Sequence, residues 1–153
     1  MKGAVSFGYS PQMVTSRVAR YNYCVDSFRD PLQSDHPSRI KPFAVVGNQV
    51  QYLHCFVKKH QLIKVDEEII RIWCPLHENV ETVRLNLYTT ETETDDPNHP
   101  SATHIQEIQV SSPDVSKGKN RNILVSLRFG GTDILFKAID EESGNVAQST
   151  ITF

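Results

Sequence analysis

The sequence predicts an all-β protein, an antiparallel β-sandwich of roughly eight strands. Three observations support this class: apolar and polar residues alternate in short runs, turn-forming residues separate the runs at regular spacing, and no stretch has a convincing helical repeat. Strands that are apolar on one face must pack that face against another sheet. We therefore expect two sheets with the apolar residues between them.

The last 32 residues carry the clearest strand pattern. Residues 123–129 alternate apolar and polar side chains, and the glycines at 130–131 are expected to supply the positive φ of a tight hairpin. Residues 134–139 form the next apolar run, which ends in a polar turn closed by Gly144. Residues 147–153 alternate again. This region is predicted to be three consecutive antiparallel strands.

The N-terminal half is less regular. Residues 17–25 are predicted to be the first strand, and residues 26–42, which contain three prolines, a long surface loop. A short strand is expected at residues 43–46 and a turn at residues 47–48. Residues 50–57 fit a strand and a helical stripe equally well, and we favour the strand.

The middle of the chain predicts three more strands. Residues 68–74 are rich in isoleucine and end at Pro75, and residues 80–90 alternate cleanly. A hairpin between these two strands is one arrangement that the sequence allows. Residues 91–102 are acidic and polar and predict a loop, and residues 104–110 predict the following strand.

Composition and charge limit the classes of function. The chain has 153 residues, enough for one domain, with 16 basic and 18 acidic residues and a net charge of −2. Scattered basic residues argue against nucleic acid as a partner, and no apolar run is long enough to span a membrane. The three cysteines, Cys24, Cys55 and Cys74, favour a reducing, cytoplasmic location. A secreted adhesion-type sandwich with one disulfide remains the alternative.

Motifs for catalysis are missing from the sequence. It contains no nucleophile motif and no phosphate-binding glycine loop, so we expect no enzyme activity in this chain. Cys74 and His77 are spaced for a zinc site, but no second ligand pair accompanies them, so no metal is expected. The carboxylates at 66–68, 95–96 and 140–142 fall at strand ends and are interpreted as solubilising edges.

Several apolar residues near turns have two interpretations. If the strands at 68–74 and 80–90 form a hairpin, Phe28, Trp73 and Leu76 converge with that hairpin at one end of the sandwich. They could simply continue the core to that end. They could also line a slot for an extended apolar peptide that is held by main-chain hydrogen bonds.

Four segments carry a resemblance to a known family. They are the run K-G-A-V-S-F-G at residues 2–8, Y-N-Y-C-V at 21–25, V-R-L-N-L-Y at 83–88, and G-T-D-I-L-F-K-A-I-D-E-E-S-G at 131–144. In order and spacing they resemble the 70-kDa heat-shock protein chaperone family, and more closely its divergent member-12 (12A/12B-like) branch. The resemblance is to the C-terminal substrate-binding β domain.

The resemblance implies a role in the stress response. Residues 1–16 would be the end of an ATPase domain and the linker that follows it, and residues 17–153 the substrate-binding sandwich, without a helical lid. The domain would hold extended hydrophobic peptides of unfolded client proteins. ATP and magnesium would bind only in the upstream ATPase domain, which would also be a partner of this chain.

The resemblance also implies a peptide-binding set. Trp73 would lie beneath the peptide, and Val83 and Leu85 would line a central apolar pocket. The alternative is a protein–protein adaptor that has lost peptide capture and uses the long loop at residues 26–42. A groove of this kind and exposed strand edges also invite self-association. The complete set is Val25, Ser27, Phe28, Trp73, Cys74, Leu76, Val83 and Leu85.

Overall fold

The computed structural model describes residues 16–152. Almost all of the segment predicted as the end of an ATPase domain and linker, residues 1–16, therefore lies outside the described residues. Two short 3-10 helices accompany the strands, at Pro37–Arg39 and Val115–Lys117. The strands are β1 Ser16–Val18, β2 Asn22–Arg29, β3 Ile40–Phe43, β4 Gly47–Val57, β5 Leu62–Lys64, β6 Glu67–Trp73, β7 Thr82–Thr90, β8 Thr103–Ser111, β9 Ile123–Phe129, β10 Asp133–Asp140 and β11 Val146–Thr152.

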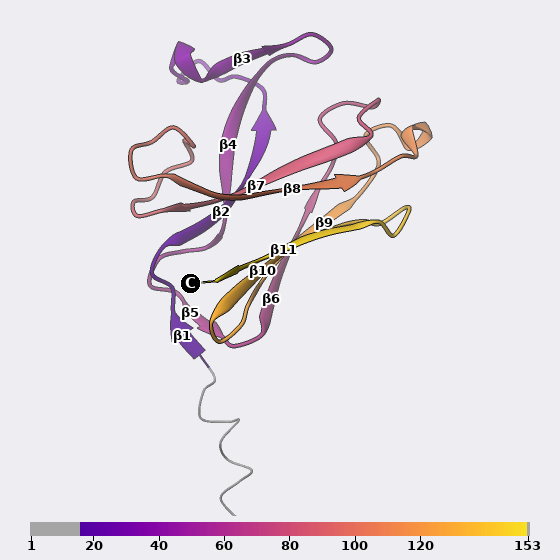
Figure 1. The fold of residues 1–153 in the computed structure, drawn as a ribbon. Coiled ribbons are helices and arrows are strands. Elements are labelled where there is room, and N and C mark those ends of the chain that lie inside the picture. The colour runs from indigo at the N-terminus through magenta and orange to yellow at the C-terminus, as the bar shows by residue number, and fades with distance from the viewer. Residues whose placement is uncertain (1–15, 153) are drawn as a thin grey trace, which may run out of the picture.

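Two antiparallel sheets pack face to face, which confirms the predicted β-sandwich (Figure 1), and no helical lid is present within residues 16–152. One sheet has the strand order β3-β4-β2-β7-β8, and the other has the order β11-β10-β9-β6. A small third sheet pairs β1 with β5 below them. The described residues contain more strands than the roughly eight predicted, because β1, β3 and β5 are too short to give a clear alternation.

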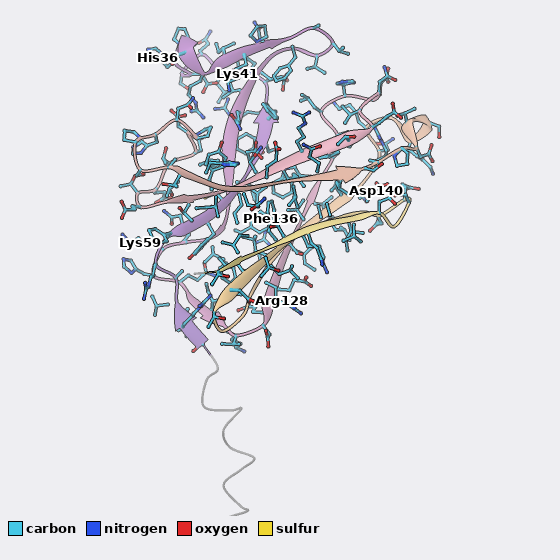
Figure 2. The ribbon with its side chains drawn as sticks, viewed as in Figure 1. His36, Lys41, Lys59, Arg128, Phe136 and Asp140 are labelled. Atoms are coloured by element: carbon cyan, nitrogen blue, oxygen red, sulfur yellow. The ribbon has the colours of Figure 1, made fainter. Side chains whose placement is uncertain are left out.

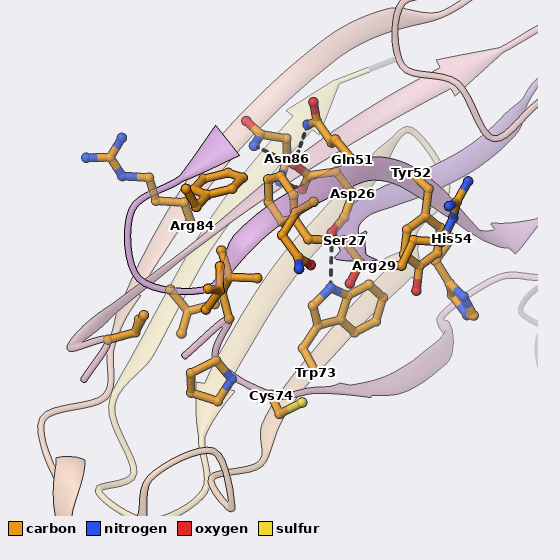
Figure 3. A pocket seen from close by; sticks show the side chains of 18 of the residues that line it. Asp26, Ser27, Arg29, Gln51, Tyr52, His54, Trp73, Cys74, Arg84 and Asn86 are labelled. Atoms are coloured by element: carbon orange, nitrogen blue, oxygen red, sulfur yellow. Dashed lines mark hydrogen bonds between the residues drawn. The ribbon is translucent and has the colours of Figure 1, made fainter. Parts of the chain in front are cut away.

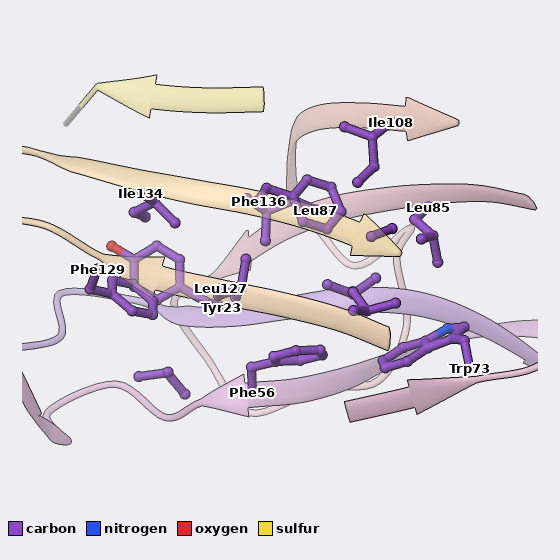
Figure 4. Packing of buried hydrophobic residues seen from close by; sticks show 14 of the residues in the cluster. Tyr23, Phe56, Trp73, Leu85, Leu87, Ile108, Leu127, Phe129, Ile134 and Phe136 are labelled. Carbon is purple, nitrogen blue, oxygen red and sulfur yellow. The ribbon is translucent and has the colours of Figure 1, made fainter. Parts of the chain in front are cut away.

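The core lies between the two large sheets (Figure 4). Val25 and Leu87 come from one sheet and Leu127 and Phe136 from the other, and all four are fully buried. Figure 2 shows Phe136 pointing into the space between the sheets. Burial of a side chain of this size stabilises the fold by about 1.5–3 kcal/mol, so this shared layer is what joins the sheets.

The prediction of one strand at residues 17–25 is wrong. β1 ends at Val18, and β2 begins only at Asn22. Between them, the backbone of Ala19 donates to Gln61 O at 2.9 Å and accepts from His60 N at 2.8 Å. These bonds hold the chain against the β4–β5 turn, so the backbone bends there although its residues have strand propensity.

The prediction of a continuous loop at residues 26–42 is also wrong. β2 continues to Arg29, and β3 occupies Ile40–Phe43 and pairs with the start of β4. The strand expected at residues 43–46 is a turn from residue 44 onward, and β4 already begins at Gly47. The strand preferred for residues 50–57 is confirmed as part of β4.

We call residues 30–49 the arm, because they extend beyond the sandwich at the top of Figure 1. Figure 2 shows His36 and Lys41 on this extension. Arg29 holds Asp35 in a two-pronged ion pair, at 2.7 and 2.8 Å. Arg39 reaches Asp95 of the β7–β8 loop at 3.2 Å. The arm is therefore tied to the sandwich at two places, the end of β2 and the β7–β8 loop.

The hairpin considered for residues 68–74 and 80–90 does not form. β6 pairs with β9, whereas β7 pairs with β2 and β8 in the opposite sheet. The chain crosses between the sheets in the segment that begins at Pro75. Arg121 fixes this crossing by donating to the carbonyls of Glu78 and Val80, at 3.0 and 2.5 Å.

The turns at the C-terminal end agree with the sequence only in part. The three strands predicted for residues 122–153 are confirmed as β9, β10 and β11. Gly144 has φ of 77°, as its turn requires, but Gly130 and Gly131 do not have positive φ. A Cβ at Gly130 would collide with the carboxylate of Asp133, which is the movable end of a side chain, so neither the backbone conformation nor the space there requires glycine.

Candidate functional site

A cavity of about 1100 Å³ opens at one end of the sandwich. The end of β2, the arm and β4 form one side, and the end of β6 with the segment that leads to β7 forms the other (Figure 3). Ordinary small-molecule pockets occupy roughly 300–1,000 Å³. This cavity is therefore large enough for several residues of an extended chain.

Six of the eight residues predicted for peptide binding line this cavity. They come from two distant parts of the sequence, β2 and the segment from β6 to β7. The other two, Val25 and Leu85, are 0% and 1% exposed in the core and do not line it. Both side chains point between the sheets, because alternation along β2 and β7 assigns them to the inner face. The six lining residues are Ser27, Phe28, Trp73, Cys74, Leu76 and Val83.

Trp73 forms a wall of the cavity. Its indole Nε1 donates to the carbonyl of Asp26 at 3.0 Å, which links the end of β6 to β2 across the gap between the sheets. Its ring lies 5.5 Å from both Phe56 and His54. Burial and the nearby Arg71 lower the pKa of His54, so this imidazole is uncharged at neutral pH.

Asp26 organises the polar part of the cavity, as the dashed bonds of Figure 3 show. Its carboxylate accepts from the backbone and side-chain nitrogens of Asn86, at 2.8 and 3.0 Å, and from Gln51 Nε2 at 2.8 Å. Burial raises the pKa of Asp26, and these hydrogen bonds oppose the rise. With its acceptor sites occupied, this carboxylate is suited to position neighbours rather than to transfer protons.

Sequence reasoning missed Asp26, Gln51 and Asn86. Asp26 was assigned to the start of a loop, whereas it is a buried residue within β2. The signal that could have revealed it is a carboxylate between Val25 and Ser27 in an alternating run. A polar side chain that is buried within a strand requires hydrogen-bond partners.

Charged side chains surround an apolar floor. Phe28, Phe43 and Leu76 contribute apolar surface, and Ile72 adds an exposed side chain at the edge strand β6. Five cations and three carboxylates line the cavity, although the whole chain carries a net charge of −2. The cations are Arg29, Lys41, Arg71, Arg84 and Lys119, and the carboxylates are Asp26, Asp30 and Glu107.

The cysteines are free thiols with three different environments. Cys24 is buried within β2 and Cys55 is half-buried within β4, whereas Cys74 is exposed just beyond β6. Within residues 16–152, no three side chains of the metal-ligating types gather into a site. Neither of the two short helices in that range is long and apolar enough to cross a membrane.

Comparison with known proteins gives one informative similarity. No protein-family model matches the chain. The chain is 25% identical to human heat shock 70 kDa protein 12B over an alignment of 168 positions, which covers all of this chain and 24% of that protein. The chain thus spans about a quarter of the length of the relative it matches. The fold defines the class of this chain as an all-β sandwich, and the similarity is to one protein of the 70-kDa heat-shock type.

Proposed function

We propose that this chain is the substrate-binding domain of a chaperone of the 70-kDa heat-shock type, related to its member-12 branch. In this proposal the large cavity holds extended hydrophobic segments of client proteins. The observation that carries it is the convergence of Phe28, Trp73 and Leu76 on one open cavity from distant parts of the chain. The similarity to heat shock 70 kDa protein 12B supports the same assignment.

The edge strand β6 supplies a means of holding such a segment. β6 pairs with β9 on one side, and its other edge borders the cavity at Arg71, Ile72 and Trp73. An extended peptide can add to a free strand edge through main-chain hydrogen bonds, while pockets accept alternate side chains. Main-chain bonding of this type accepts many sequences, which suits a protein that binds unfolded chains.

The remaining functions belong to a longer protein. We propose that ATP and magnesium bind in an upstream ATPase domain, outside this chain, and that the protein acts in the cytoplasm in the stress response. This chain would then be a non-enzymatic module. Its own contribution, peptide capture, is testable without the other domain.

The test measures fluorescence anisotropy of a labelled, extended, leucine-rich peptide. Leu76→Asp introduces a charge at a half-buried position on the cavity wall, and Ile70→Asp introduces the same charge at an exposed position of β6 that does not line the cavity. We expect saturable binding that Leu76→Asp weakens at least about tenfold and Ile70→Asp leaves unchanged. Equal binding by both variants, or no binding by the wild type, would refute the proposal. Val83→Asp is less suitable, because Val83 also belongs to the core.

A second candidate is an adaptor that recognises a folded partner through the arm. Leu32 and Val45 on the arm are 58% and 68% exposed, and neither lines the cavity. Exposed apolar residues at the end of an extension are typical of contact sites. The double substitution Leu32→Ser with Val45→Ser would then abolish partner binding, measured by co-purification, and leave peptide binding intact.

A further inference from the structure

Two of the three cysteines face each other across neighbouring strands. Cys24 on β2 and Cys55 on β4 are register partners in the antiparallel ladder. Residues directly opposite in such a pair have Cα atoms about 4.5–5.5 Å apart, within the range of about 4.4–6.8 Å that disulfides span. A cross-strand disulfide would therefore require little movement of the backbone.

A β-bulge sets this alignment. The register shifts between Tyr23, which pairs with Val57, and Cys24, which pairs with Cys55. Phe56 is the extra residue, and it packs into the core. Bulges change the direction of the side chains beside them. If the register of Tyr23 with Val57 continued without a bulge, Cys24 would be paired with Phe56 instead of with a second thiol.

Both cysteines line a small cavity of about 240 Å³. It is separate from the large one, and Cys74 does not line it. Its wall is fixed by Asn22, whose side chain accepts from Lys59 N at 2.7 Å and donates to Thr90 Oγ1 at 3.0 Å. A water molecule occupies roughly 30 Å³, so a small peroxide can enter.

The two thiols have different acidities. The pKa of Cys55 is lowered to about 7, chiefly by a hydrogen bond from Cys24 and also by the nearby Lys58, against the opposing effects of burial and Glu93. The hydrogen bond and burial raise the pKa of Cys24. Lys59 and Glu91 also line the cavity. At neutral pH, Cys55 is the sulfur available as a thiolate, and Cys24 keeps its proton.

We propose that Cys24 and Cys55 form a peroxide-sensitive dithiol, in which Cys55 reacts first and Cys24 closes a cross-strand disulfide. The Cys55 thiolate attacks a peroxide oxygen, so that an S–O bond forms, the O–O bond breaks, and hydroxide leaves and takes up a proton as water. The Cys24 sulfur then attacks the sulfenic sulfur of Cys55, and the S–O bond breaks as a second water leaves with the Cys24 proton. Two thiols and one hydrogen peroxide give one disulfide and two waters.

The disulfide would lie close to the organising residue of the large cavity. Asp26 follows Cys24 by two residues on β2, and it holds Trp73 through its carbonyl and Asn86 through its carboxylate. A covalent link between β2 and β4 at this point restrains the strand that carries these contacts. The dithiol proposal itself does not depend on peptide binding.

The experiment uses hydrogen peroxide and the chain with Cys74→Ser, which retains only this pair of thiols. We expect both thiols to be lost together, an intact mass lower by about 2 Da, and a proteolytic fragment that joins the segments containing Cys24 and Cys55. Urea-unfolded chain should form this cross-link far more slowly. Oxidation of either sulfur to sulfinic or sulfonic acid without a cross-link would overturn the proposal.

Two further variants separate the roles of the sulfurs. In Cys24→Ala, Cys55 should stop at a sulfenic acid, about 16 Da heavier, that dimedone traps. In Cys55→Ser, Cys24 should stay reduced, and equal oxidation of both variants would contradict the assigned order. Fragment mapping of the wild-type chain requires no substitution, so a misfolded variant cannot conceal the answer.

A matched pair of charge variants tests the environment of Cys55. At pH 7, Lys58→Gln should slow sulfenic acid formation roughly twofold, and Glu93→Gln should accelerate it to a similar extent. The opposite signs follow from the charges that the two residues place near the thiolate. Identical rates in both variants would show that the small cavity does not activate Cys55.

Discussion

Arg121 is a fully buried cation that holds the connections at one end of the sandwich. Its guanidinium donates to the carbonyls of Gly118, Val80, Ser112 and Glu78 at distances of 2.5–3.0 Å. These carbonyls belong to three separate parts of the chain. One side chain therefore satisfies acceptors that would otherwise be buried without a partner.

Arg121→Met should destabilise the protein strongly. Methionine fills part of the space but leaves four carbonyls without donors, and each such group costs about 1–3 kcal/mol. Because water would reach some of them, we expect a loss of about 3–5 kcal/mol in the free energy of unfolding, measured by urea denaturation. Arg128→Met, on an exposed position of β9, is the control, and a similar loss in both variants would contradict this role.

At the scale of the element, the turn between β10 and β11 depends on the backbone of one glycine. Gly144 has φ of 77°, and a Cβ there would meet no atom within 4 Å. Gly131, in the preceding turn, is equally open but lacks a positive φ. The two positions thus differ in backbone conformation and not in available space.

Gly144→Ala should lower the free energy of unfolding by about 1–2 kcal/mol, because an L-residue is strained in the left-handed region. Gly131→Ala should leave stability unchanged or raise it by about 0.4–1 kcal/mol, through a less flexible unfolded chain. Thermal or urea unfolding of the two variants measures the difference. Equal effects would mean that the turn changes its conformation to accept alanine.

The arm is an element held by charge rather than by the core. The Arg29 guanidinium and the backbone of Leu32 hold the pKa of Asp35 well below its usual range. A carboxyl whose pKa is lower in the folded protein than in the unfolded chain stabilises the folded protein. This stabilisation is complete at pH values above the unfolded pKa of 3.8 and is lost as the pH falls through the folded pKa. The arm should therefore loosen in strong acid before the sandwich unfolds.

Asp35→Asn should produce the same loosening at neutral pH. Amide hydrogen exchange in β3 should become severalfold faster, while exchange in β9 and the global unfolding transition stay unchanged. Glu142→Gln, which removes an exposed ion pair of 3.9 Å with Lys117 at a distant turn, is the control. Unchanged exchange in β3 after Asp35→Asn would show that strand pairing alone holds the arm.

At the scale of the whole molecule, the charge around the large cavity differs in sign from the charge of the chain. Five cations and three carboxylates line the cavity, and the carboxylate of Asp26 is buried. The cations come from several elements around the cavity, including Arg29 at the end of β2, Arg71 on β6 and Arg84 on β7. The field at the site therefore favours acidic residues that flank an apolar segment.

A leucine-rich peptide with aspartates at both ends should bind about threefold or more tightly than the same peptide with lysines. Because the charges are exposed, the difference should shrink as ionic strength rises and the Debye length falls. Anisotropy titrations at two salt concentrations measure both effects. Tighter binding of the lysine peptide would contradict the inference that the charge around the cavity favours acidic residues. Arg84→Gln should reduce the preference, and Arg128→Gln, outside the cavity, should not.

Prediction from the sequence succeeded where the information is local. β9, β10 and β11 were predicted because alternation and turn residues lie within a few positions of each other. The pairing of β6 was not, because its partner β9 lies about fifty residues further along the chain and several strands could have served equally well. The arm was mistaken for a loop because prolines and polar residues hide the short strand β3, which only β4 stabilises.

The residues of the candidate site also fall into those that the sequence predicted and those that it did not. Phe28, Trp73 and Leu76 were expected to converge, and they line one cavity, although the hairpin invoked to bring them together does not exist. Asp26 was missed because the residues that satisfy its carboxylate, Gln51 and Asn86, lie 25 and 60 positions away. Val25 and Leu85 entered the predicted set through the family resemblance, which does not distinguish the core from a cavity that continues it.

The sequence by itself determined the all-β class, the last three strands and the apolar character of one end of the sandwich, because each depends on the order of side chains within a single strand. The tertiary structure decided which strands pair, where the chain crosses between the sheets, that Asp26 and Arg121 are buried, and that Cys24 faces Cys55. These features depend on contacts between residues far apart in the chain. Their energies exist only after both sheets have assembled, so no local pattern could reveal them.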